Sequence, residues 1–163
     1  MANRLFTNEI LEGIMSLIET NLKASLSLVG IYRGNLAWLP PNEITSMANG
    51  IWLNLEAPVD LEEVSMPNGL LDTYKIRIIY IRRIDLTTNP LDQKIEDADD
   101  IANLVWDNKK PTFSLGGSGN AHILWWLPRT VEYEPAEDSL VAAISADLMA
   151  IAINTELKLR TRI

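Results

Sequence analysis

Acidic side chains and a single histidine are the groups in this sequence with the clearest capacity for chemistry. Asp97, Asp99 and Asp100 lie close together, and carboxylate oxygens are the ligands that hard divalent cations prefer. On a helix, however, Asp99 and Asp100 point in different directions, and no glycine pattern of a calcium-binding loop surrounds them. The spacing therefore favours a solvated helical face over a metal site.

A second acidic group consists of Glu132, Glu134, Glu137 and Asp138. Two carboxylates at a fixed separation carry out glycoside hydrolysis, one as the acid and the other as base or nucleophile. Nothing in the sequence fixes such a separation here, so we predict a polar loop.

The remaining candidates are a glycine-rich run at residues 116–119 and His122. The run lacks the Lys-Ser or Lys-Thr of a phosphate-binding loop and does not lead into a helix, which favours a loop between strands. His122 has neither a serine nucleophile motif nor an orienting acid at a recognisable spacing, so a surface or partly buried histidine is favoured. We predict no catalytic residue, cofactor or metal, and residue chemistry alone does not identify the function.

Composition narrows the function classes. The chain has 163 residues, 47% of them apolar and 22% charged, which is typical of one soluble globular domain over residues 1–163. Its 14 basic and 22 acidic side chains give a net charge of −8, which disfavours general binding to nucleic-acid phosphates or anionic lipid. The absence of cysteine excludes disulfides and cysteine nucleophiles. No signal peptide is expected, because acids at Glu9 and Glu12 interrupt the N-terminal sequence. No membrane segment is expected either, because the apolar run at residues 140–153 is broken by Asp147 and is shorter than the ~20 residues that cross a bilayer.

The first elements follow from hydrophobic periodicity. Apolar residues at three- and four-residue steps predict a helix over residues 8–22, with Thr7 or Asn8 as its cap. β-branched and aromatic residues predict strands at 27–33 and 51–55.

Two loops are predicted from turn and breaker residues. Pro40 and Pro41 argue against a regular helix or central strand, so residues 35–50 are expected to form a surface loop. Acidic and turn residues predict another loop at 60–68.

A long strand and a helix after it are the most informative part of the chain. The strand begins near Leu71 and alternates, which predicts a half-buried strand. One face is made by Tyr74, Ile76, Ile78 and Tyr80, and the other by Lys75, Arg77, Ile79 and Ile81, so the outer face begins basic. Residues 90–108 form the helix, because Pro90 suits the first helical position. Its apolar stripe is expected to be Leu91, Ile95, Ala98, Ala102 and Val105, with acids on the other side.

Two late elements complete the sheet. Residues 122–133 read as a strand in which Pro128 implies an edge, a bulge or a bend. Residues 140–155 fit a strand or a helical stripe, and β-branched residues near the end favour the strand. The predicted fold is α+β, a mostly antiparallel sheet with two packing helices.

Opposite charges on the strand and the helix suggest a contact between copies of the chain. The candidate interface residues are Lys75, Arg77, Arg82, Arg83, Asp92, Glu96, Asp99 and Asp100. The alternative is that these are ordinary solvent-facing charges. If they are exposed, reversal of Arg77 and Arg82 to glutamate weakens assembly and leaves the subunit folded. Trp125 and Trp126 face opposite sides of a strand, so one is expected in the core and the other at an interface.

The order of elements resembles that of the tail terminator, or tail completion, proteins of long-tailed bacteriophages. The resemblance is carried by residues 72–84, the helix at 90–108, and Val131-Glu132-Tyr133 followed by Glu137 and the late apolar strand. It implies a subunit of a six-membered ring in the virion neck that stops tail-tube polymerisation and joins the tail to the head. It also implies a protein without enzyme activity or cofactor, assembled in the host cytoplasm.

The implied partners are other copies of the chain, a tail-tube or sheath protein and a head-tail connector protein, with DNA only in transit and no membrane. Acids expected to face the channel are Asp60, Glu62, Glu63, Glu137 and Asp138. The alternatives are another neck or connector subunit, or a small hydrolase or ligand-binding domain with a site built from dispersed carboxylates.

Overall fold

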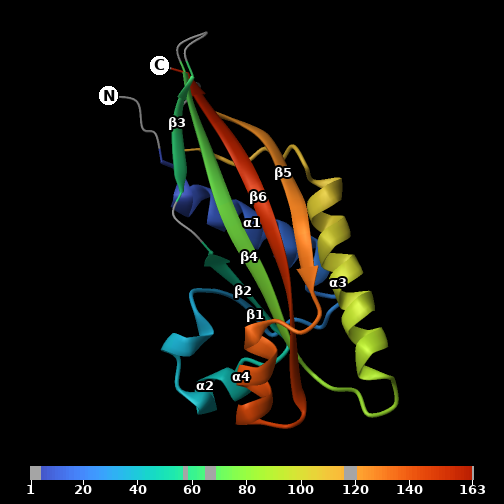
Figure 1. The fold of residues 1–163 in the computed structure, drawn as a ribbon. Helices are drawn as coiled ribbons and strands as arrows, with labels where there is room; N and C mark the ends of the chain where they lie inside the picture. Colours follow the sequence, from blue (N-terminus) through green and yellow to red (C-terminus); the bar gives the residue numbers. More distant parts are fainter. Residues whose placement is uncertain (1–4, 57–58, 65–68, 116–120, 163) are drawn as a thin grey trace.

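The computed structural model describes residues 5–56, 59–64, 69–115 and 121–162 (Figure 1). In chain order the elements are α1 (Thr7–Leu22), β1 (Gly30–Arg33), the 3-10 turn η1 (Leu36–Trp38), α2 (Pro41–Ser46), β2 (Gly50–Leu55), β3 (Asp60–Val64), β4 (Gly69–Arg83), α3 (Pro90–Asp107), β5 (Ala121–Glu132), α4 (Ala136–Ile144) and β6 (Leu148–Arg162). The described strands form one six-stranded sheet, antiparallel except for the β1–β2 pair. The predicted α+β class with a mostly antiparallel sheet is confirmed, and two short helices, α2 and α4, add to the two that were expected.

β4 and β6 form the centre of the sheet. The strand order is β1-β2-β4-β6-β5, and β3 pairs with the part of β4 that β2 does not reach. β4 and β6 pair from Gly69 opposite Arg162 to Arg83 opposite Leu148. Two long neighbouring strands therefore position β2, β3 and β5, and β2 in turn positions β1.

Helices cover the two faces of the sheet unequally. α1 and α3 pack on one face, where Ile14 and Ile18 of α1 and Val105 of α3 join the inner side chains of the strands in one core. On the opposite face a smaller core joins Leu36 of η1, Ile44 of α2 and side chains of α4 to the strands. Figure 1 shows α2 and α4 at one end of the long strands, and no described helix over the other end of that face.

β4 is buried on both faces, contrary to the half-buried strand predicted. Tyr74, Ile76, Ile78 and Tyr80 lie in the larger core, as expected. Ile79 and Ile81 lie in the smaller core beneath α2 and α4, and Arg77 is only 8% exposed. Of the predicted outer face within 74–81, only Lys75 is exposed.

The loop predicted at residues 35–50 is wrong. It contains η1 and α2, because Pro41 occupies the start of α2, where a missing amide costs nothing and the fixed φ suits a helix. The loop predicted at 60–68 is also wrong in its first part, which is strand β3. The strand predicted at 27–33 starts only at Gly30, because Ser27 has a φ of 51° and cannot continue a strand.

The late elements combine both interpretations of residues 140–155. Helix α4 ends at Ile144, and β6 begins at Leu148, so the strand is confirmed for the second part of the segment. The strand predicted at 122–133 is confirmed as β5, an edge strand with register shifts on either side of residues 124 and 129.

The two long helices are confirmed with corrections of detail. α1 begins after Phe6, and neither Thr7 nor Asn8 supplies a side-chain cap. α3 turns a different face to the sheet from the one predicted, with Leu91 and Ile95 exposed. Its buried residues are Gln93, Lys94, Asp97, Ala98, Ile101, Leu104 and Val105.

Candidate functional site

Arg77, in the middle of β4, is the centre of a cluster of polar side chains. Its Nε and Nη2 donate to the two carboxylate oxygens of Glu137 at 3.2 and 2.8 Å. Its Nη1 donates to Asn154 Oδ1 at 2.8 Å and to Glu132. The sheet positions these groups, since Asn154 is the partner of Arg77 on β6, while Glu132 ends β5 and Glu137 lies in the first turn of α4.

Glu132 of this cluster is suited to binding a cation rather than to acid–base chemistry. Partial burial acts to raise the pKa of Glu132, but hydrogen bonds from Arg77 and Asn154 outweigh it and hold that pKa below its ordinary value. A glycosidase acid needs the opposite shift, because it must carry a proton near neutral pH. The polar loop predicted for Glu132 and Glu137 is wrong, since both lie at the ends of regular elements and bind one arginine.

Two charged side chains of α3 bind residues of the same chain, and one of them, Asp97, belongs to the helical face that the sequence predicts to be solvated. Asp97 is 5% exposed and accepts a hydrogen bond from Arg82 Nη1 at 2.8 Å. Burial raises the pKa of Asp97 above its ordinary value, although the bond from Arg82 acts to lower it. Lys94 Nζ donates to the carbonyl oxygen of Tyr133 at 2.7 Å and to Asp138 at 3.0 Å. These bonds compensate for the burial of polar groups and explain why α3 turns this face inward.

The other sequence candidates are not brought together. Among the described residues, no three acids or histidines are close enough to hold a metal ion. His122 is exposed on β5. The glycine-rich run at 116–119 lies outside the described residues. A groove of about 750 Å³ between α1 and β1 contains Glu12 and Arg33, which already form an ion pair at 3.9 Å.

The predicted interface residues divide into two groups. Arg77 and Arg82 bind carboxylates within the chain, and the exposed Arg83 binds Asp147 at 2.7 Å. Lys75 and the acids of α3 are exposed, namely Asp92, Glu96, Asp99 and Asp100. An interface role for this second group stays a prediction.

The adjacent tryptophans of β5 face opposite sides, as predicted. Trp126 is completely buried and donates from Nε1 to Thr155 Oγ1 at 2.9 Å. Trp125 is half-buried on the other face, with the guanidinium of Arg129 4.9 Å and the amine of Lys158 5.8 Å from its ring centre.

The Arg77 cluster was not found from the sequence. Its members are up to 77 positions apart, so only the strand register brings Arg77 beside Asn154. The pairing of two alternating strands would have given this neighbour, had the register been known.

Comparison with known proteins places the fold but not the activity. No protein-family model matches the sequence, and no curated protein matches it. Among solved structures, the chain is similar to a chain of the "Virion of native gene transfer agent (GTA) particle", with a TM-score of 0.53 and 14% sequence identity. The likeness covers 97% of this chain and 99% of the other, so it extends over the whole fold. In the described part of the chain, no helix has the length and apolarity needed to cross a membrane.

Proposed function

We propose that the protein is a structural component of a virion, a tail terminator whose ring at the head-tail junction caps the tail tube and joins the tail to the head. The observation that carries this proposal is the likeness, over almost the full length of both chains, to a chain from a virion particle. The order of elements predicted from the sequence supports the finer assignment, because it resembles that of tail terminators along most of the chain.

The proposal includes a homohexamer formed by a single domain over residues 1–163. Its partners are the tail-tube or sheath protein on one side and a head-tail connector protein on the other, and the subunit assembles in the host cytoplasm. The side chains support a structural role without enzyme activity, since the carboxylates of the Arg77 cluster already bind a permanent cation.

The acids proposed to face the channel are fewer than the sequence suggested. Glu137 and Asp138 lie on α4 and bind Arg77 and Lys94. Asp60 and Glu62 are exposed on β3 and keep their place in the proposal, while the side chain of Glu63 lies outside the described part of the structure. Exposed carboxylates repel DNA phosphates, which favours transit without adhesion.

Particle morphology with and without the gene tests the assignment. For a terminator, we expect heads without attached tails together with tail tubes of uncontrolled length, measured by electron microscopy of lysates. Tails of normal length that fail to join heads would instead identify a connector subunit. Normal particles in the absence of the gene would reject both structural roles.

A further inference from the structure

α3 carries an apolar row on its solvent side. Leu91, Ile95, Ala102 and Trp106 are spaced by four and seven residues, so they lie in one line along the helix. Leu91 is 54%, Ile95 38% and Trp106 53% exposed. The helix is therefore apolar toward the sheet and again along one outer line. An exposed apolar row of this kind is unfavourable in water and marks an interaction surface.

Acids border this apolar row. Asp92, Glu96, Asp99 and Asp100 are all exposed on the same helix. Partial burial and then the neighbouring charges of Glu96 and Asp99 raise the pKa of Asp100 above its ordinary value. Mutual repulsion of this kind is relieved when a cation approaches.

A second surface with the opposite charge lies on the uncovered part of the sheet. Residues directly opposite each other in neighbouring strands share a face, and the register pairs Trp125 with Lys158 and His122 with Arg160. Leu157 and Leu159, which alternate with these β6 residues, are buried in the larger core on the other face. We call the surface made by Lys75, Trp125, Arg129, Lys158 and Arg160 the basic sheet patch.

Cations of the basic sheet patch are available to a partner. Arg129 binds Glu156 at 3.3 Å. In the described part of the chain, Lys75, Lys158 and Arg160 form no ion pair within 4.0 Å. Trp125 adds a half-buried aromatic surface of the kind that dominates protein interfaces.

We propose that the outer face of α3 lies across the basic sheet patch of the next copy of this chain. The acids of α3 meet Lys158 and Arg160 there, and one part of the apolar row meets Trp125. A sheet face is normally covered by a second layer, and the neighbouring α3 supplies the layer that this end of the sheet lacks. The proposal rests on the ring of the proposed function and names the two surfaces that form it.

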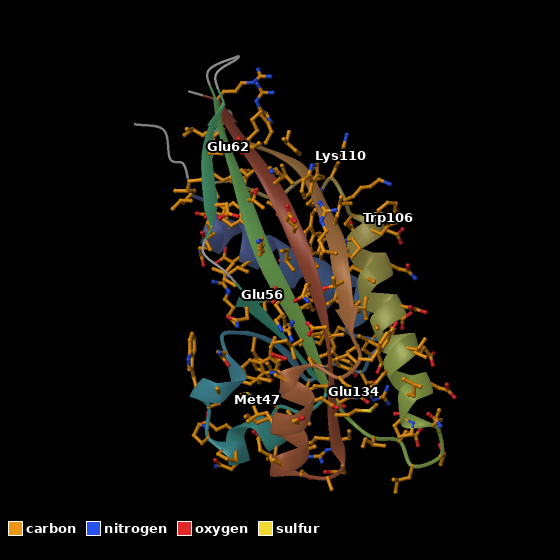
Figure 2. The ribbon with its side chains drawn as sticks, in the orientation of Figure 1. Met47, Glu56, Glu62, Trp106, Lys110 and Glu134 are labelled. Atoms are coloured by element: carbon orange, nitrogen blue, oxygen red, sulfur yellow. The ribbon has the colours of Figure 1, made fainter. Side chains whose placement is uncertain are left out.

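The position and size of the two surfaces suit a ring. α3 packs beside β5 on the face of the larger core and the patch lies on the opposite face, so the contact joins different surfaces and repeats from copy to copy. Figure 2 shows Trp106 on the α3 side of the molecule, away from Glu62 on the β3 side. The acids of α3 from Asp92 to Asp100 span about 12 Å of the helix, and residues 156 to 160 of β6, from the partner of Lys75 to Arg160, span about 13 Å, so the lengths are comparable.

Site-specific cross-linking tests the contact in a chain that contains no cysteine. Full-length protein with Glu96→Cys and Lys158→Cys is treated with a short bis-maleimide, both free in solution and in purified particles. We expect a ladder of covalent multimers. The matched control combines Glu96→Cys with Glu19→Cys, because Glu19 is exposed on α1, away from the patch, and we expect no ladder from it.

Charge exchange separates the contact from folding. The double variant Lys158→Glu, Arg160→Glu is expected to weaken association at least about tenfold in native mass spectrometry. The double variant Glu96→Lys, Asp99→Lys is expected to weaken it equally. The protein with all four substitutions is expected to associate again, because the two surfaces have exchanged their charges. If a double variant lost association because it was misfolded, two further substitutions would not recover association.

Two results would overturn the contact. Multimers that persist in every charge variant and give no selective ladder would reject these surfaces while leaving the ring intact. A chain that is monomeric in solution at every concentration, and that forms no multimer in particles, would reject the ring as well.

Discussion

Arg77 of β4 donates two parallel hydrogen bonds to Glu137 of α4, across 60 positions of sequence, and so joins the central strand to a helix on the less covered face. The arginine is 8% exposed and also binds Glu132 and Asn154. Removing one partner of a buried cluster leaves the others uncompensated, which costs more than the pair itself contributes.

Arg77→Met is therefore expected to lower the free energy of unfolding by about 3 kcal/mol, at the low end for a buried pair because Glu132 is partly exposed. Arg77→Glu is expected to cost more, which makes it a folding variant rather than the assembly variant suggested by the sequence. Urea denaturation measures both. Lys75→Met, two residues away and exposed, is the control and should change stability by less than about 0.5 kcal/mol. Equal effects at the two positions would refute the role of the cluster.

The raised pKa of Tyr80 predicts that the free energy of unfolding falls at alkaline pH. Burial, followed by the nearby charge of Asp97, raises its pKa from the ordinary 10.0 to about 12. The folded state thus keeps a proton that the unfolded state releases, so stability falls as pH rises above 10 toward 12. Tyr80→Phe should reduce this fall, measured by urea denaturation across that range.

The same substitution should cost about 1 kcal/mol at neutral pH, since it removes the hydrogen bond from Tyr80 to the carbonyl oxygen of Leu26. Tyr133→Phe, at a more exposed position, is the control. An alkaline profile unchanged by Tyr80→Phe would show that other groups cause the loss.

Gly13 of α1 is expected to resist replacement by alanine although it lies inside a helix. A Cβ there would lie 2.3 Å from Phe113 Cδ1, so the ring must move. Gly13→Ala should destabilise the protein by about 1–3 kcal/mol, more than the ~1 kcal/mol gained in helix propensity. In a Phe113→Ala background, Gly13→Ala should instead stabilise the protein. Thermal denaturation of the wild type, the two single variants and the double variant measures this as a double-mutant cycle. A stabilising effect in the wild-type background would show that the ring moves freely.

Duplex DNA should bind weakly to the isolated protein at physiological salt. The net charge is −8, and the few cations of the basic sheet patch neutralise too few phosphates to release many counterions. Fluorescence anisotropy with labelled duplex measures this, and tight binding that weakens steeply with salt would contradict it. Lys158→Glu removes one cation of the basic sheet patch and so tests whether any residual DNA binding comes from that patch.

The sequence predicts the position of a helix or strand well where one hydrophobic periodicity dominates. It predicts poorly which face of that element is buried, because the burial depends on contacts with distant residues. α3 has the predicted length, and Asn89 caps it with a bond to the amide of Leu91. Its orientation could not be predicted, because Lys94 and Asp97 are buried by partners far along the chain. The apolar row expected to face the sheet lies partly in solvent for the same reason.

The candidate site shows the same limit. The charges of residues 75–83 are visible in the sequence, but the partner of each arginine is not, since Arg77 binds Glu137 of α4, Arg82 binds Asp97 of α3 and Arg83 binds Asp147 between α4 and β6. Proline alone does not determine the local structure. Pro41 starts helix α2, whereas Pro128 lies in the bulged edge strand β5.

The position of β6 determines when this fold can be completed on the ribosome. β6 is the last element in sequence, yet it lies between β4 and β5. Until residues 148–162 have left the exit tunnel, β4 and β5 lack their shared neighbour and keep unpaired edges and apolar side chains in water. The nascent chain therefore carries one unpaired edge of β4 from the emergence of that strand until β6 emerges, and chaperones that hold exposed strands are expected to raise the yield of this fold.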